Sequence, residues 1–363
     1  MSTLFQPISL GSMVIKNRFV RSATHDFMGN LDGTISDSEI KLYRTLAQND
    51  VGLIITAHSY VQHPLGRVAP GQNAICDDQF IEGYRRLADT VHEYGAKFVL
   101  QISHAGRQFS VPMEGLVPVA PSAVTDNSIG ITPRALTEKE IWELIECYTA
   151  AMLRAKEAGC DGVQVHIAHG YLLSEFISPY TNKREDQWGG SIENRTRILK
   201  EIIVRGRKIV GEAYPVLVKL NTTDGFEGAG YLALEDVIYT AKLLDSLGVV
   251  AIEVSGGIKE SKKGFAWPGI RTPEKEAYFS TAAKAIKAEV ACPVILVGGL
   301  RSLAVMESVL ERGIADMVAL CRPYVKEPDL VKRFSNGQAK VACVSCNACF
   351  NPKGIRCNYK DNK

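Results

Sequence analysis

The chain has 363 residues, of which 46% are hydrophobic and 23% are charged, and its formal net charge is +2. This composition is typical of a globular protein that buries a sizeable core, and it excludes a disordered chain. The near balance of charges argues against nucleic acid or an anionic membrane as a partner, so we expect a small-molecule substrate.

The N-terminal sequence MSTLFQPISLGSMVIKNRF has no basic segment followed by an apolar one. No later stretch approaches the ~18 continuous apolar residues of a membrane-spanning helix. These features predict a cytoplasmic protein that does not bind membranes. They leave the oligomeric state open, and a homo-oligomer is one alternative.

Short apolar runs rich in β-branched residues alternate with longer segments whose apolar residues recur every three or four positions. This alternation is typical of α/β proteins. The runs are almost continuously hydrophobic, as parallel strands buried on both faces require. In chain order, the predicted strands lie at residues 19–23, 51–56, 97–102, 162–166, 216–220, 251–255, 294–298 and 317–321.

Helix signals lie between these strands. Ser36 and Glu39 have the spacing of a capping box, as do Thr137 and Glu140. Gly159 follows a long periodic run, where a helix C-cap is expected. The repeated alternation of strand and helix favours a single TIM (β/α)₈ barrel over a doubly wound sheet. We expect the barrel at residues 1–340 and a short Cys-rich tail at 341–363.

Three long segments follow predicted strands, at residues 103–136, 167–190 and 255–273. In a TIM barrel the chemistry takes place at the C-terminal ends of the strands, so these loops should surround the substrate.

The second of these loops begins with a distinctive polar group. His166 ends a strand, His169 follows three residues later, and Tyr171 follows two residues after that. Two imidazoles and a phenol can polarise the oxygen of an α,β-unsaturated carbonyl and deliver a proton to its α-carbon. The spacing alone leaves two alternatives open, which are a metal site and an ordinary polar loop.

The loops after the seventh and eighth strands predict a phosphate site. They contain Gly298 with Gly299, and Arg322. Adjacent glycines let the backbone approach an anion, and an arginine can pair with it through two hydrogen bonds. TIM barrels often bind a cofactor phosphate at this position.

Six motifs in chain order carry a family resemblance that extends over the whole barrel. They are NRFVRSATH from Asn17, QISHAGRQ from Gln101, VAPSAV from Val119, HIAHGYLLSEFISPYTNKREDQWGGSIENR from His166, VGGL from Val297 and MVALCRPYVKEPDL from Met317. In these motifs the chain resembles the old yellow enzyme family of FMN oxidoreductases.

The resemblance implies FMN at the mouth of the barrel, NAD(P)H as the hydride donor, and reduction of an activated C=C bond. It implies that His166 and His169 bind the substrate carbonyl and that Tyr171 donates the proton. Together with the phosphate loops, it gives the expected cofactor-binding residues as Ser22, Ala23, Thr24, His25, Ala57, Gln101, Lys219, Gly298, Gly299, Cys321 and Arg322.

Three positions depart from the commonest pattern of the family. Lys219 stands where an Arg is usual, which keeps the charge beside the flavin but loses the planar fork. Cys321 stands where a Gly usually precedes the phosphate-binding Arg. His25 stands where other branches have a Thr or Cys, so an imidazole is expected beside the flavin.

The tail ACVSCNACFNPKGIRCNYK contains Cys343, Cys346, Cys349 and Cys357 in the pattern C-x2-C-x2-C-x7-C. Closely spaced thiolates of this kind bind iron–sulfur clusters or zinc. The dienoyl-CoA reductase branch of the family has a similar group that holds a [4Fe–4S] cluster, although the final gap is shorter here. A cluster, a zinc ion and a metal-free tail all remain open.

We interpret the sequence as a cytoplasmic ene-reductase that uses NAD(P)H and FMN to reduce an enone. One alternative is an amine dehydrogenase that passes electrons from the flavin to a cluster. The other is a flavin-binding redox sensor without catalytic activity.

Overall fold

A computed structural model of the chain describes residues 2–109 and 115–359. Residues 110–114 of the predicted loop 103–136, Met1, and residues 360–363 of the predicted tail therefore lie outside the described residues.

All of the predicted strands form, and they close into a parallel barrel. They are β3 (Phe19–Arg21), β4 (Leu53–Ile55), β6 (Lys97–Ser103), β9 (Gly162–Ile167), β10 (Val216–Asn221), β11 (Ala251–Ser255), β12 (Val294–Val297) and β13 (Met317–Leu320). Each strand pairs with the next, and β13 pairs with β3 to complete the ring. The TIM-barrel prediction is confirmed.

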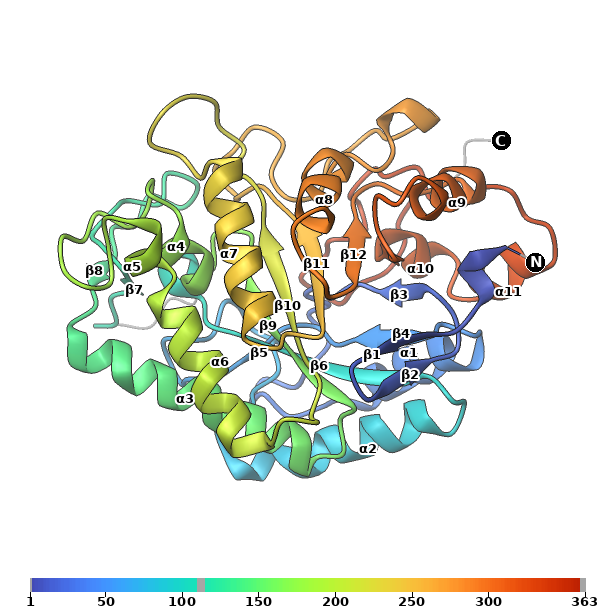
Figure 1. The fold of residues 1–363 in the computed structure, drawn as a ribbon. Helices are drawn as coiled ribbons and strands as arrows, with labels where there is room; N and C mark the ends of the chain where they lie inside the picture. The colour runs from blue at the N-terminus through green and yellow to red at the C-terminus, as the bar shows by residue number, and fades with distance from the viewer. Residues whose placement is uncertain (1, 110–114, 360–363) are drawn as a thin grey trace.

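Helices separate the strands and lie outside them (Figure 1). Both predicted capping boxes are present, and Gly159 follows the end of its helix with φ of +78°. The α-helices are α1 (Asp37–Gln48), α2 (Ile81–His92), α3 (Glu138–Glu157), α4 (Leu172–Ile177), α5 (Ile192–Arg195), α6 (Arg197–Val210), α7 (Leu234–Ser246), α8 (Ser280–Lys287), α9 (Leu303–Glu311), α10 (Arg322–Lys326) and α11 (Leu330–Ser335).

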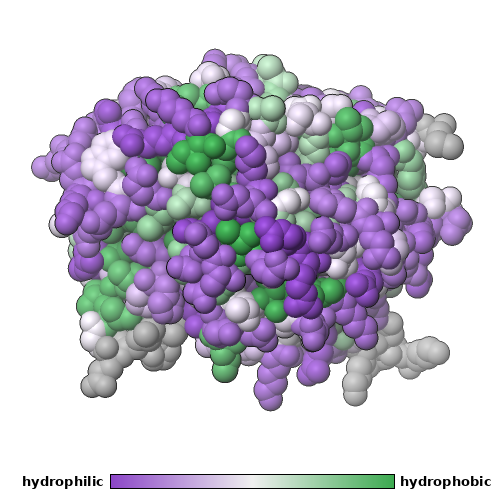
Figure 2. All heavy atoms as spheres, turned by 90° about the horizontal axis from the view of Figure 1, so that it is seen from below, coloured by the Kyte–Doolittle hydropathy of each residue, from purple (hydrophilic) through white to green (hydrophobic). Residues whose placement is uncertain are grey.

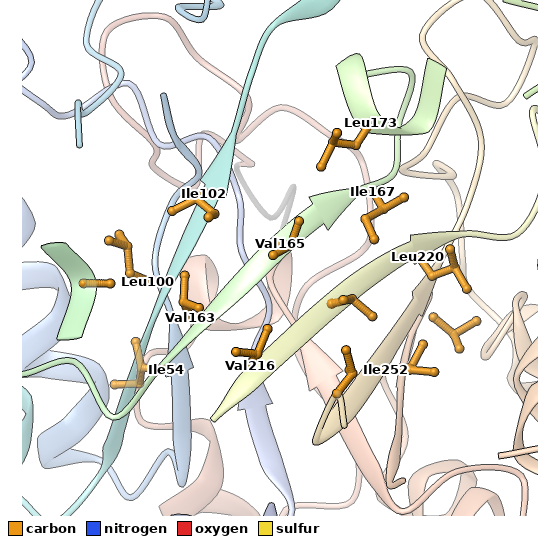
Figure 3. Packing of buried hydrophobic residues seen from close by; sticks show 14 of the residues in the cluster. Ile54, Leu100, Ile102, Val163, Val165, Ile167, Leu173, Val216, Leu220 and Ile252 are labelled. Atoms are coloured by element: carbon orange, nitrogen blue, oxygen red, sulfur yellow. The ribbon is translucent and has the colours of Figure 1, made fainter. Parts of the chain in front are cut away.

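Side chains alternate along each strand between the barrel interior and the surrounding helices. Val163, Val165 and Ile167 of β9 belong to the large hydrophobic cluster that includes the helices (Figure 3). A second buried cluster lies inside the barrel and includes Val99 of β6 and Leu217 of β10. The near-continuous hydrophobicity of the strands thus has its expected cause, burial on both faces.

The sequence did not predict an N-terminal hairpin made of β1 (Ile8–Leu10) and β2 (Met13–Ile15). Leu10, Met13 and Ile15 pack with the interior cluster. Ser12 Oγ donates a hydrogen bond to the carbonyl of Ala213, just before β10. The hairpin therefore covers the N-terminal end of the barrel and leaves the opposite end for ligands.

Shorter unpredicted strands lie in the loops, namely β5 (Ser59–Tyr60), β7 (Val119–Ala120) and β8 (Arg134–Ala135). The surface seen from below in Figure 2 is mostly hydrophilic, with small and separate hydrophobic patches. Among the described residues, no helix has the length and apolar character needed to span a bilayer.

Candidate active site

The C-terminal ends of the barrel strands enclose a cavity of about 400 Å³. This end of a TIM barrel is where ligands bind. Most of the site residues predicted from the sequence line the cavity, namely Ser22, Ala23, Thr24, His25, Gln101, His166, His169, Tyr171, Lys219, Gly299, Cys321 and Arg322. The fold thus brings residues from most barrel strands to one place.

Ala57 and Gly298 are predicted site residues that do not line this cavity. The backbone N–H of Ala57 donates a hydrogen bond to the hydroxyl of Tyr43 at 2.8 Å. The carbonyl of Gly298 accepts one from the backbone N–H of Tyr278 at 3.3 Å. Both residues are next in sequence to a lining residue, and their cofactor contacts remain predictions.

The fold brings the three predicted donors together on one side of the cavity. His166 lies near the end of β9, and His169 and Tyr171 lie in the turn before α4. The ring centres of His169 and Tyr171 are each 5.1 Å from that of His166. Gly170 permits this turn with φ of +78°, and a Cβ there would lie 2.7 Å from Nε2 of Gln108.

Burial decides the charge state of these three groups. It is the main reason that the pKa values of His166 and His169 lie well below the usual value, and nearby Lys219 lowers them further. Burial also raises the pKa of the Tyr171 phenol. At neutral pH the site therefore presents two neutral imidazoles and a protonated phenol, each able to donate a hydrogen bond.

His58 belongs to the same group, and the sequence interpretation missed it. Its ring centre is 4.9 Å from that of Tyr171 and 5.8 Å from that of His166. Its Nδ1 lies 2.8 Å from Oγ of Ser103. The signal in the sequence was a polar residue shortly after the apolar run of β4, the same signal that identified His166.

Two further contacts that were missed hold His169 in place. Its Nε2 lies 2.7 Å from Oγ of Ser255, the last residue of β11. The ring of Phe265, in the predicted loop 255–273, stacks on His169 with ring centres 4.9 Å apart. That loop therefore contributes directly to the wall of the cavity.

The cavity also contains a fixed cation. The Lys219 ammonium donates a hydrogen bond to Oγ of Ser22 at 2.9 Å and lies 3.2 Å from Oε1 of Glu253. Lys219 and Gln101 are both almost fully buried. A cavity lined by a fixed positive charge and an amide suits a cofactor that has hydrogen-bonding groups and becomes negative on reduction.

The predicted phosphate loops lie elsewhere in the lining. Gly299 has φ of +68°, and a Cβ on it would lie 2.8 Å from the ring of Tyr278, so a side chain there would be strained. The Arg322 guanidinium donates hydrogen bonds to the carbonyl of Trp267 at 2.9 Å and to Oδ1 of Asn347 at 2.7 Å. A close backbone approach beside an arginine fits the phosphate of FMN.

The four tail cysteines line one small hollow, and Arg322 lines both this hollow and the main cavity. Burial raises the pKa of Cys349 to about 12 and also raises that of Cys343. Within residues 2–109 and 115–359, no three His, Cys, Asp or Glu side chains are placed to hold a metal ion. Ser345 and Phe350 of the tail line the main cavity, a contribution the sequence did not predict.

Comparisons with known proteins agree with this architecture. An NADH oxidase from Thermoanaerobacter brockii is 39% identical over 347 residues, which are 95% of this chain and 52% of that protein. An NADPH dehydrogenase from Clostridium acetobutylicum is 33% identical over 330 residues, 90% of this chain and 93% of that protein. The chain thus spans about half the length of the first relative and almost all of the second.

An old yellow enzyme homologue from Zymomonas mobilis has a similar structure, with a TM-score of 0.77 and 29% identity over 93% of this chain and 94% of that one. A family model described as NADH:flavin oxidoreductase / NADH oxidase matches residues 3–340. The chain therefore belongs to the NADH:flavin oxidoreductase / NADH oxidase family, which confirms the resemblance to the old yellow enzymes.

Proposed function

We propose that this chain acts in the cytoplasm as an FMN-dependent ene-reductase that uses NAD(P)H to reduce the C=C bond of small α,β-unsaturated carbonyl compounds. The observation that carries the proposal is the group of uncharged donors His166, His169 and Tyr171 on one side of the cavity. The family, and relatives named NADH oxidase and NADPH dehydrogenase, support flavin chemistry with a nicotinamide.

The donors have separate roles in this proposal. His166 and His169 hold the carbonyl oxygen and stabilise the negative charge that develops there as the β-carbon accepts a hydride. Tyr171 keeps its proton because burial raises its pKa, and it delivers that proton to the α-carbon. Ser255 and Phe265 keep His169 oriented.

The remaining cavity residues fit FMN. When bound, FMN would take up a hydride from NAD(P)H and supply it to the substrate. Lys219 would stabilise the negative charge of the reduced ring, and Gln101 would hydrogen-bond its pyrimidine end. Arg322 and the backbone at Gly298 and Gly299 would hold the phosphate. The ring would also be lined by Ser22, Ala23, Thr24, His25, Ala57 and Cys321.

For the tail, we propose a [4Fe–4S] cluster rather than a single zinc ion. Four thiols line one hollow, yet no three potential ligands among the described residues are placed to hold one ion. A cluster suits such an arrangement better because each cysteine binds a different iron. Anaerobic reconstitution should give protein that contains iron and acid-labile sulfide in equal amounts. Cys346→Ser should lose both, whereas the control Cys147→Ser, outside the tail, should retain them. Bound zinc, or no metal, would contradict this.

The cofactor is tested by its identity after release. Protein reconstituted with a mixture of FMN and FAD should retain FMN without a covalent bond and release it on heat denaturation. The reason is that the cavity offers one phosphate site, at the ends of β12 and β13. Release of FAD, or retention of no flavin, would contradict the proposal.

A further inference from the structure

A chain of hydrogen bonds crosses the barrel interior beneath the cavity. Nε2 of Gln101 donates to Oε1 of Gln164 at 2.6 Å, and Nε2 of Gln164 donates to Oε2 of Glu253 at 2.9 Å. These three side chains come from β6, β9 and β11, and their exposed fractions are 1%, 0% and 0%. Buried polar groups of this kind are costly unless they are paired, so we expect these three hydrogen-bonded side chains to keep one fixed arrangement.

The other oxygen of Glu253 holds the cation of the cavity. Its Oε1 accepts a hydrogen bond from Oγ of Ser22 at 2.6 Å and lies 3.2 Å from Nζ of Lys219. Nζ of Lys219 in turn donates to the same Ser22 hydroxyl at 2.9 Å. Glu253 does not line the cavity, whereas Ser22 and Lys219 do. One carboxylate therefore acts on the cavity from below.

The carboxylate also fixes the direction of the amide chain. An ionised carboxylate only accepts hydrogen bonds, so the nitrogen of Gln164 must face Glu253 and its oxygen must face Gln101. One N–H of Gln101 is then used in this row of hydrogen bonds, and its oxygen is available to accept a hydrogen bond from a ligand in the cavity. An acceptor at Gln101 matches an N–H donor on the ligand.

We propose that Glu253 is a positioning residue with two effects. It offsets part of the positive charge of Lys219, and it fixes the orientation of Gln101 toward the flavin ring. This inference rests on the proposed binding of FMN. Because the carboxylate lies beside the Lys219 ammonium, it offsets part of the positive charge that would otherwise favour the reduced, negative ring. Glu253 thereby keeps the reduction potential of the flavin below the value that Lys219 alone would set.

The first test is the midpoint potential of the FMN-loaded protein, measured anaerobically against a reference dye. Glu253→Gln removes the negative charge at nearly constant volume, and we expect its potential to rise. A tenfold shift of the equilibrium toward reduced flavin corresponds to a rise of about 30 mV for this two-electron couple. Glu253→Asp retains the negative charge, so its midpoint potential should stay close to that of the wild type. A merely structural role of Glu253 does not predict this rescue.

A matched control is Glu39→Gln. Glu39 is as buried as Glu253, with an exposed fraction of 0%, but it lies on α1 and does not line the cavity. Burial raises its pKa to about 8, so it is mostly uncharged at neutral pH and its replacement changes little charge. The midpoint potential of the flavin in Glu39→Gln should therefore equal that in the wild type. Equal potentials in Glu253→Gln and the wild type would overturn the inference.

A second variant tests the orientation of Gln101 separately from the charge at Lys219. Gln164→Leu breaks the link to Gln101 but leaves the Glu253–Lys219 pair in place. We expect its Kd for FMN to rise at least fivefold while the potential stays the same. If Glu253→Gln does not fold, this variant decides, and an unchanged Kd overturns the inference. If the wild type itself binds no FMN, the proposed function has failed instead.

Discussion

Two layers of the barrel interior lie two residues apart on the same strands and have opposite chemistry. In the lower layer, Val99, Leu217 and Ala251 belong to an apolar cluster that the N-terminal hairpin covers. In the upper layer, Gln101 and Lys219 follow on β6 and β10 and line the cavity, and Glu253 follows on β11 beneath it.

The difference shows how one strand serves two purposes. A step of two residues keeps a side chain on the interior face and moves it toward the C-terminal end of the strand. The lower layer should therefore determine stability, and the upper layer should determine function. Substitutions in one layer should leave the property of the other largely unchanged.

The largest expected effect is on proton delivery. Tyr171→Phe should leave the reduction of flavin by NAD(P)H almost unchanged, because that step needs no proton on carbon. Alkene reduction should slow about 10²–10⁴-fold, the usual contribution of a positioned general acid. Quinone acceptors, which take electrons onto oxygen, should be much less affected. Rapid mixing measures each half-reaction, and equal slowing with every acceptor would show that Tyr171 only packs.

Next in size is the loss of the carbonyl donors. His166→Ala combined with His169→Ala should weaken enone binding and slow flavin reoxidation at least a hundredfold, since one such donor contributes ~3 kcal/mol. FMN should stay bound, because neither imidazole belongs to the proposed phosphate or pyrimidine contacts. Unchanged reoxidation kinetics in the double variant would place the carbonyl elsewhere in the cavity.

A substitution in the lower layer should change stability and leave catalysis almost unaffected. Leu217→Ala should reduce the free energy of unfolding by ~2–5 kcal/mol, because it leaves a void in a closely packed core. The kcat for alkene reduction should change less than twofold. Leu31→Ala is the control, since Leu31 has an exposed fraction of 77% and its truncation should have little effect. Denaturant unfolding measures the free energy of unfolding, and steady-state kinetics measure kcat. A large loss of kcat with unchanged stability would contradict the assignment of stability to the lower layer and function to the upper layer.

The smallest expected effect is that of pH on enone binding. An unperturbed histidine becomes protonated near pH 6.5, but burial lowers the pKa of His166 and His169 well below that value. Both stay neutral as pH falls from about 8 to 6, so the Kd for an enone should be nearly constant over this range. A tenfold change in Kd centred near pH 6.5 would show that an imidazole titrates there.

The sequence was sufficient to predict the barrel and a set of site residues, most of which line the cavity. Apolar strands and capping boxes are local signals, and His166 was singled out because ligands bind at the C-terminal ends of TIM-barrel strands. Lys219 was predicted only from the resemblance to the old yellow enzyme family. Glu253 was not found, although it is a charged residue within an apolar run. Alternation places it on the interior face, but its partners depend on how neighbouring strands are staggered, which no local pattern encodes.

The tail was predicted only in part. Its cysteine spacing was recognised, and the structure gathers these thiols at one hollow. The contact between Asn347 and Arg322, by which the tail joins the cavity wall, was not predicted. That contact links a polar side chain of the tail to the first residue of α10, and neither segment has a periodic pattern that could reveal it.

An anaerobic titration of the FMN-loaded protein, followed by flavin absorbance, tests the central claim most directly. Addition of NADH or NADPH should bleach the flavin, and subsequent addition of cyclohexenone should restore the oxidised spectrum with formation of cyclohexanone. Bleaching by an amine but not by a nicotinamide would support the amine dehydrogenase alternative. A flavin that neither nicotinamide bleaches, or a bleached flavin that the enone does not reoxidise, would contradict the assignment as an ene-reductase.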